Sequence, residues 1–137
     1  MNIVIDTNVF VAAFRSQTGA SFQIVSMIFT TKIFTVHLST PLLTEYESKI
    51  RERTPISFSE TDEFLSNLKE ASVVHKIYYL FQGFLRDTND DMLLELAVKS
   101  QSSYIVSHNI KDLQGAISFG VTPITPKDFL TILRQLQ

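Results

Sequence analysis

Short runs of β-branched and aromatic residues alternate with longer segments of helical periodicity along the whole chain. The apolar runs predict strands at residues 2–6, 34–38, 73–75, 103–106 and 121–123. The other segments predict helices at about residues 21–31, 40–52, 57–70, 88–100 and from 125 onward. Strands that alternate with helices are typical of βαβ units. We therefore predict an α/β fold built on a mostly parallel sheet, with its last strand at an edge because that strand contains Pro123.

The bulk composition limits the class of protein. The chain has 137 residues, of which 45% are hydrophobic and 19% are charged. This provides a core and argues against disorder, and the length fits one domain, residues 1–137. The absence of cysteine excludes disulfides, thiolate metal sites and a thiol nucleophile. No apolar run approaches the roughly 20 residues of a membrane span, and no basic stretch precedes the first one. We therefore expect a cytoplasmic protein.

The formal net charge of −2 bears on nucleic-acid binding. Proteins that hold nucleic acid by electrostatics alone are usually clearly basic. Any contact of this chain with nucleic acid must therefore be local, transient or mediated by a metal ion.

The first predicted strand ends on Asp6, which is followed by Thr7 and Asn8. In open α/β folds, ligands bind beyond the carboxyl ends of the strands. A single Asp at this place can also cap a helix that begins at Thr7, and taken alone that interpretation is favoured. The other acids of the chain decide between the two roles.

Two acids, Asp90 and Asp91, lie at the start of a helix that Thr88 or Asn89 is expected to cap. Asp90 shares its helical face with apolar residues three, four and seven positions further on, whereas the face of Asp91 is mixed. We therefore predict that Asp90 faces the interior, where it needs a partner or a metal ion. Asp91 is interpreted as a first-turn acid favoured by the helix dipole.

Polar residues also follow a later strand. Val106 is followed by Ser107, His108, Asn109 and, further on, Asp112. Asp112 can be a turn residue and Asn109 a cap. His108 has no second histidine at metal-ligand spacing, so we interpret it as a surface or structural residue. The glycines after this segment predict a loop.

The helix after the second strand carries Glu45 and Glu47, and periodicity does not choose between them. An acid from this helix would join Asp6 and Asp90 at one edge of the sheet. Clustered carboxylates repel one another unless a cation neutralises them. Oxygen ligands without cysteine or paired histidine favour Mg²⁺ or Mn²⁺ over zinc. The pattern therefore predicts metal-assisted phosphate or phosphodiester chemistry.

Four segments, in this order, resemble the motifs of the PIN-domain family, at residues 3–9, 39–46, 86–97 and 104–113. This is a family of metal-dependent nucleases that includes the toxins of bacterial VapC-type toxin–antitoxin pairs, and residues 119–130 resemble its toxin subgroup. The resemblance implies a three-layer α/β/α sandwich and an endoribonuclease that uses Mg²⁺ or Mn²⁺. It further implies a homodimer and a small antitoxin partner.

The resemblance also assigns residues. It selects Glu45 over Glu47, and it agrees with the helical-face argument for Asp90. The implied catalytic and metal-binding residues are Asp6, Glu45 and Asp90, assisted by Asp112. The residues implied to orient these ligands or the scissile phosphate are Asn8, Ser107 and Asn109.

The chain departs from the family at two positions. Many members have Asp where Asn109 stands, so the fourth acid is either replaced or supplied by Asp112. Ser107 stands where Thr is common. The first departure motivates an alternative, a PIN-like domain that binds RNA or protein without cutting. Haloacid-dehalogenase-type phosphatases fit less well because Asn8 stands where they have a second Asp, and receiver domains fit less well because Asp6 has no acidic neighbour.

An aromatic-rich segment runs from Tyr78 to Phe84. It is one candidate surface for the antitoxin or for a second copy of the chain. A loop that packs on the core is the alternative.

Overall fold

The computed structural model describes residues 1–137. Its strands form one sheet in the order β3-β2-β1-β4-β5, and every pairing is parallel. The strands are β1 (Asn2–Ile5), β2 (Thr35–Ser39), β3 (Val73–His75), β4 (Tyr104–Val106) and β5 (Thr122–Ile124). The predicted parallel sheet and the edge position of the last strand are confirmed.

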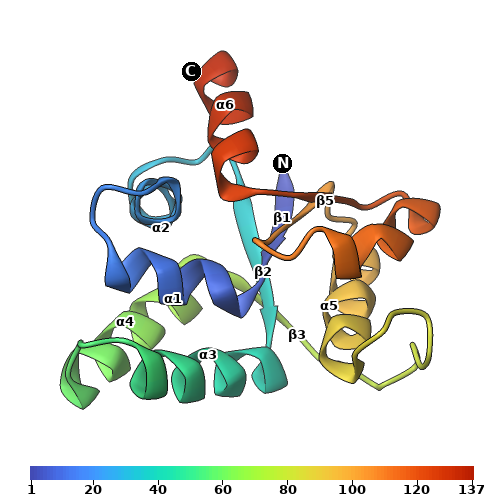
Figure 1. Ribbon diagram of the computed structural model, residues 1–137, viewed down its shortest axis with the longest axis horizontal. Helices are drawn as coiled ribbons and strands as arrows, with labels where there is room; N and C mark the ends of the chain where they lie inside the picture. The colour runs from blue at the N-terminus through green and yellow to red at the C-terminus, as the bar shows by residue number, and fades with distance from the viewer.

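Helices cover both faces of this sheet and complete the predicted three-layer α/β/α sandwich (Figure 1). One layer contains α1 (Thr7–Arg15), α2 (Ala20–Thr30), α3 (Thr40–Arg53) and α4 (Phe58–Ala71). The opposite layer contains α5 (Thr88–Lys99) and the 3₁₀ helix η1 (Lys111–Phe119). The last helix, α6 (Pro126–Leu136), packs against α2. None of these helices combines the length and the apolarity that a membrane span requires.

The central strand β1 explains why the chain adopts this order. Ile3, Val4 and Ile5 are all fully buried, because a strand with parallel neighbours on both sides and helices on both faces has no solvent-facing side. Under α1, the rings of Phe10 and Tyr46 meet at 4.5 Å between centroids and join α1 to α3.

The chain leaves β1 toward β2 and β3, and then crosses to the other side of β1 to form β4 and β5. This reversal creates a topological switch point between β1 and β4, the place where open α/β folds bind ligands. Asp6 follows β1 and Ser107 follows β4. The backbone N–H of Asp6 donates to the carbonyl of Val106 at 2.9 Å, so the two strand ends lie side by side.

Two local predictions were wrong, whereas the helix that Asp6 was expected to cap is present as α1. The 3₁₀ helix η1 stands where glycines predicted a loop. The N-cap of α5 is Asp87, whose side chain accepts the N–H of Asn89 at 2.8 Å, and not Thr88 or Asn89. An N-cap must precede the residues whose N–H groups it accepts, and Asp87 directly precedes Thr88, the first residue of α5.

Candidate active site

Asp6 caps α1 and also lies at the carboxyl end of β1, beside the end of β4. One carboxylate oxygen, Oδ1, accepts the N–H of Thr7 at 2.8 Å and caps α1. The other oxygen, Oδ2, accepts the hydroxyl of Ser107 at 2.7 Å and lies 3.4 Å from the amide nitrogen of Asn8. Burial raises the pKa of Asp6 above its usual value, and Glu45 adds to this, while the bonds from Ser107 and Thr7 oppose it.

Ser107 connects the ends of β1 and β4. Its side chain is fully buried. The hydroxyl donates to Asp6 and accepts from the side chain of Asn8 at 3.2 Å and from the N–H of Asn109 at 2.9 Å. The amide oxygen of Asn8 in turn accepts the N–H of His108 at 3.2 Å. The hydroxyl proton of Ser107 is therefore directed at Asp6, because both acceptor positions of the oxygen are occupied.

The structure brings Glu45 and not Glu47 to this place. The hydroxyl of Thr7 donates to Oε2 of Glu45 at 2.5 Å. The next residue, Tyr46, is fully buried and donates its hydroxyl to the carbonyl of Ile5, which ties α3 to the end of β1. Glu47 instead lies 3.5 Å from Arg51 on the surface of α3. Burial, together with Asp6 and Glu45, raises the pKa of Tyr46 well above its usual range, so its hydroxyl remains a donor.

Asp90 meets the other acids from the first turn of α5. Its side chain is half-buried and accepts no hydrogen bond. Burial raises the pKa of Asp90 from 3.8 to about 7, and the negative charges of Asp6, Asp87, Asp112 and Glu45 add to this in that order. Acids from several different elements therefore converge on the carboxylate of Asp90.

Asp112 occupies the remaining corner, and Asn109 supports it. The amide nitrogen of Asn109 donates to Oδ2 of Asp112 at 2.9 Å, so the amide faces Asp112 rather than Asp6. The guanidinium of Arg86 lies 3.8 Å from Oδ1 of the same carboxylate. Sequence reasoning missed Arg86, although it lies only four residues before Asp90, because spacing within a loop does not show where a side chain points.

Asp91 lies in the first turn of α5 as expected, but the prediction that Asp90, and not Asp91, faces the interior was wrong. Its side chain is only 4% exposed, which makes it more buried than Asp90. Asp91 accepts the backbone N–H groups of Gly83 at 2.9 Å and Leu85 at 2.7 Å. The loop before α5 folds over this face of the helix, so α5 has a second covered face that helical periodicity does not reveal.

His108 is exposed, and its ring nitrogen Nε2 lies 3.1 Å from the hydroxyl of Ser21. This agrees with the predicted surface or structural role.

The chemistry of the donors suits a hard divalent cation such as Mg²⁺ or Mn²⁺, because carboxylates, amides and hydroxyls supply only oxygen ligands. As the side chains stand, no three His, Asp or Glu residues lie close enough together to hold one ion. Glu45 is directed to Thr7, and Asp112 to Asn109. Binding of a cation therefore requires side-chain rearrangement, and relief of the repulsion at Asp90 would favour it.

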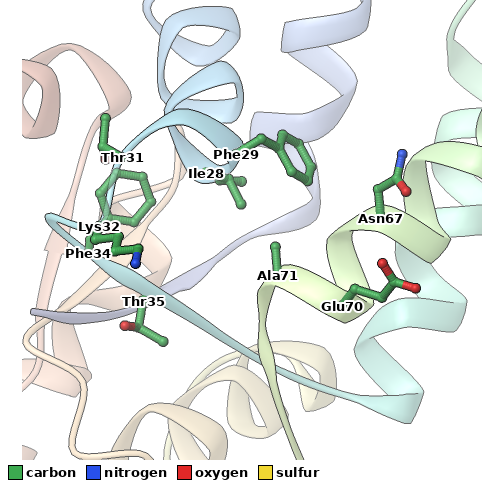
Figure 2. A pocket seen from close by; sticks show the side chains of 9 residues that line it. All are labelled: Ile28, Phe29, Thr31, Lys32, Phe34, Thr35, Asn67, Glu70 and Ala71. Carbon is green, nitrogen blue, oxygen red and sulfur yellow. The ribbon is translucent and has the colours of Figure 1, made fainter.

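A pocket of about 610 Å³ lies away from this site. It is formed by the end of α2, the start of β2 and the end of α4. Figure 2 shows Lys32 and Thr35 on one side of it and Asn67 and Glu70 on the other. Because Thr35 begins β2, the cavity belongs to the amino end of the sheet, opposite the acids.

Among solved structures, the fold is similar to VapBC2 from Rickettsia felis bound to a DNA fragment from its promoter, with a TM-score of 0.62 and 13% identity over 91% of this chain and 98% of that chain. It is also similar to VapBC-1 from nontypeable Haemophilus influenzae, with a TM-score of 0.65 and 13% identity over 93% and 99% of the two chains. PAE2754 from Pyrobaculum aerophilum gives a TM-score of 0.57 and 10% identity over 98% and 90%. These identities show the fold alone.

Sequence comparison identifies the family. A search among curated proteins gives no match. A family model described as the PIN domain matches residues 2–111, a range that includes Asp6, Glu45 and Asp90. The resemblance noted in the sequence is thus confirmed at the level of the family. Because this match spans most of the chain, the chain belongs to the PIN-domain family.

Proposed function

We propose that this PIN-domain chain is an Mg²⁺- or Mn²⁺-dependent endoribonuclease. The observation that carries the proposal is the convergence of Asp6, Glu45 and Asp112 on Asp90 at the switch point of the sheet. A fold does not retain mutually repelling carboxylates at a ligand-binding edge without a use for them, since each is costly when left unneutralised. Metal-assisted cleavage of a phosphodiester bond is a reaction that uses such a cluster.

The residues that would hold one or two ions are Asp6, Glu45 and Asp90, with Asp112 assisting. When bound, such an ion would lower the pKa of a water molecule and neutralise charge on the phosphate and on the leaving oxygen. The chain's own part is orientation. Ser107 and the N–H of Thr7 fix Asp6, and the hydroxyl of Thr7 fixes Glu45. These donors act as positioning groups for the acids.

Asn8 and Asn109 have different parts in this arrangement. Asn8 bridges Asp6 and Ser107 and keeps the ends of β1 and β4 in register. Asn109 holds Asp112, so the neutral amide supports the fourth acid instead of replacing it. We therefore assign the fourth acidic role to Asp112, and we assign to Asn109 the role of directing its carboxylate.

The proposed partners follow from the solved structures that share the fold. Two of them are named as VapBC proteins. We propose that this chain is likewise the toxin of a type II toxin–antitoxin pair, that it forms a homodimer, and that a small antitoxin binds it. Its expression in a bacterial host should arrest growth, and coexpression of a short neighbouring open reading frame should restore it. Growth at the normal rate on expression of the folded chain would contradict the toxin assignment.

The test of the chemistry is cleavage of a labelled RNA with and without Mn²⁺. Asp90→Asn should abolish cleavage and leave the fold intact, because it removes a ligand charge from a half-buried, solvent-accessible side chain. EDTA should abolish cleavage by the unmodified chain. Full activity in Asp90→Asn, or cleavage that EDTA does not affect, would contradict the proposal.

Helix α3 offers a matched control. Glu45 and Glu47 lie on the same helix, but only Glu45 contacts Thr7 at the site, whereas Glu47 pairs with Arg51. Glu45→Gln should reduce cleavage strongly, and Glu47→Gln should leave it near the level of the unmodified chain. Equal effects of the two substitutions would show that cleavage depends on the total negative charge of α3 and not on the position of Glu45 at the site.

A second candidate is a PIN-like domain that binds RNA or protein without cutting. It is favoured by the spacing of the acids, no three of which can hold an ion as they stand. Calorimetry with Mn²⁺ separates the two candidates. Heat of binding that the Asp6→Ala variant lacks supports the nuclease, and absence of binding by the unmodified chain supports the inert domain.

A further inference from the structure

Three exposed or half-exposed phenylalanine rings join the loop before α5 to the end of η1. Phe81, Phe84 and Phe119, here called the phenylalanine cluster, contact one another with centroids 5.4 Å apart in every pair. As whole residues, Phe84 is 55% exposed and Phe119 is 39% exposed. Rings that could pack inward but remain at the surface in a group mark a binding surface.

The loop that carries two of these rings is fixed in place. Two buried acids of α5, Asp91 and Glu95, hold it through its backbone. Together they accept the backbone N–H groups of Tyr78, Leu80, Phe81, Gly83 and Leu85. A loop held by charge-assisted hydrogen bonds on both sides of Phe84 presents its ring in a preset position, which lowers the entropy cost of binding.

The cluster borders the acid site through Arg86. This residue is two positions after Phe84, so their Cα atoms are at most about 7 Å apart. The guanidinium of Arg86 is 81% exposed and lies 3.8 Å from the carboxylate of Asp112. An exposed cation therefore stands between a group of aromatic rings and the acids. A polymer that alternates flat rings and phosphates matches that order of groups.

We propose that the phenylalanine cluster is a stacking platform for an unpaired base of single-stranded RNA, and that Arg86 contacts a phosphate between this base and the scissile bond. The inference rests on the proposed nuclease function, which brings RNA to the acids. Aromatic faces stack on any base, so the platform selects unpaired strands rather than a sequence. The exposed guanidinium favours an anionic strand over an apolar protein partner on this surface.

The chain contains no tryptophan, which permits a direct test. Phe84→Trp keeps an aromatic face and introduces a single indole whose fluorescence reports stacking. Leu80→Trp is the matched control, because Leu80 lies in the same loop, is 73% exposed and is outside the cluster. In EDTA, which prevents metal-dependent cleavage, a short oligoadenylate should quench Phe84→Trp. It should leave Leu80→Trp unchanged, and an abasic strand of equal length should quench neither.

Affinities measured by fluorescence anisotropy at low ionic strength complete the test. Phe84→Ala should weaken oligoadenylate binding by about five- to a hundredfold and leave the abasic strand unaffected. Arg86→Ala should weaken both strands and reduce the slope of log affinity against log salt by about 0.7. Circular dichroism of each variant checks that it is folded. If Phe84→Ala does not fold, the fluorescence quenching of Phe84→Trp still tests the platform.

Equal loss of affinity for both strands in Phe84→Ala, or equal quenching of the two tryptophan variants, overturns the platform. A second result also overturns the platform. If Phe84→Ala lowers the mass of the protein oligomer in solution but leaves RNA affinity unchanged, the surface is an interface with a second copy of the chain. The nuclease proposal fails separately. Base-dependent binding without cleavage in Mn²⁺ leaves the platform standing, whereas cleavage without base-dependent binding removes the platform alone.

Discussion

At the scale of single residues, the hydroxyl of Ser107 makes hydrogen bonds that an apolar side chain cannot make. It is fully buried, donates to Asp6 and accepts from Asn8 and Asn109. Ser107→Ala should lower the free energy of unfolding by about 1–3 kcal/mol, because it leaves buried polar groups without partners. It should also weaken Mn²⁺ binding by about 10- to 100-fold. Urea denaturation and calorimetry measure the two effects.

Ser107→Thr is the control for this prediction, since it keeps the hydroxyl. It should recover most of both losses. If Ser107→Ala and Ser107→Thr behave alike, added or missing volume at this buried position, and not the hydrogen bonds, explains the result.

Asp90 gives the metal-free chain a pH dependence of unusual sign. Its pKa of about 7 lies above the unfolded value of 3.8, so the folded chain binds the proton more tightly between these values. The free energy of unfolding in EDTA should therefore fall as pH rises from about 4 to 7. Asp90→Asn should flatten this decline relative to the unmodified chain. Denaturation curves at several pH values measure it, and identical slopes in the two proteins would contradict the assignment.

What the sequence predicted at this scale depended on whether a residue's partners were local. The position of Asp6 after a β-branched strand was enough to place it at the sheet edge. The choice of Glu45 over Glu47 needed the family resemblance, because the contact of Glu45 with Thr7 joins residues 38 positions apart. Arg86 remained unseen for the same reason, as its contact with Asp112 depends on how a loop closes.

At the scale of secondary-structure elements, α5 separates two neighbouring acids by function. Asp90 faces the other acids, and Asp91 binds the loop before the helix. Asp91→Asn should speed hydrogen exchange at the amides of Gly83 and Leu85, because an amide cannot accept as well as a carboxylate. Asp90→Asn should leave exchange at these amides unchanged. Hydrogen-exchange mass spectrometry distinguishes them, and equal protection in both variants would contradict this division.

The pairing of β2 with β3 contains a second titrating contact. Nδ1 of His37 lies 2.8 Å from Nε2 of His75 in a register that pairs Ser39 with His75. Burial lowers the pKa of both histidines below 6.5, and for each a neighbouring positive charge adds to this. Protonation therefore favours the unfolded chain, and this stability is lost as pH falls below about 6.5.

His75→Asn should reduce the loss of stability that occurs as pH falls. Between pH 6.5 and 5, its free energy of unfolding should change less steeply than that of the unmodified chain. Because Asp90 acts in the opposite direction over this range, the comparison is best made in an Asp90→Asn background. A slope unaffected by His75→Asn would show that the histidine pair does not titrate during unfolding.

Elements buried on both faces were predicted best. The run Ile3 to Ile5 indicated a central strand, and β1 is the middle strand of the sheet. Other features were missed for different reasons. The burial of Asp91 was missed because the loop that covers it is held by backbone N–H groups, which carry no sequence signature. The 3₁₀ helix η1 was missed because its glycines also suit a loop.

At the scale of the whole molecule, the proposed binding of a metal ion would be linked to stability. An ion that binds the folded chain alone stabilises it by about 2.7 kcal/mol at one hundred times its dissociation constant. Mn²⁺ should therefore raise the melting temperature of the unmodified chain by several degrees and that of Asp6→Asn by much less. Equal shifts in the two proteins would indicate that Mn²⁺ binds away from the acids.

The bond between Ser107 and Asp6 has a consequence for how the protein is made. It joins residues 101 positions apart, and it depends on β4 pairing with β1. Synthesis on the ribosome releases β1 and Asp6 first, and Ser107 follows only 101 residues later. The nascent chain therefore holds an incomplete site until β4 and Ser107 have emerged. If the finished protein cuts RNA, its own ribosome and message do not meet that activity before this point.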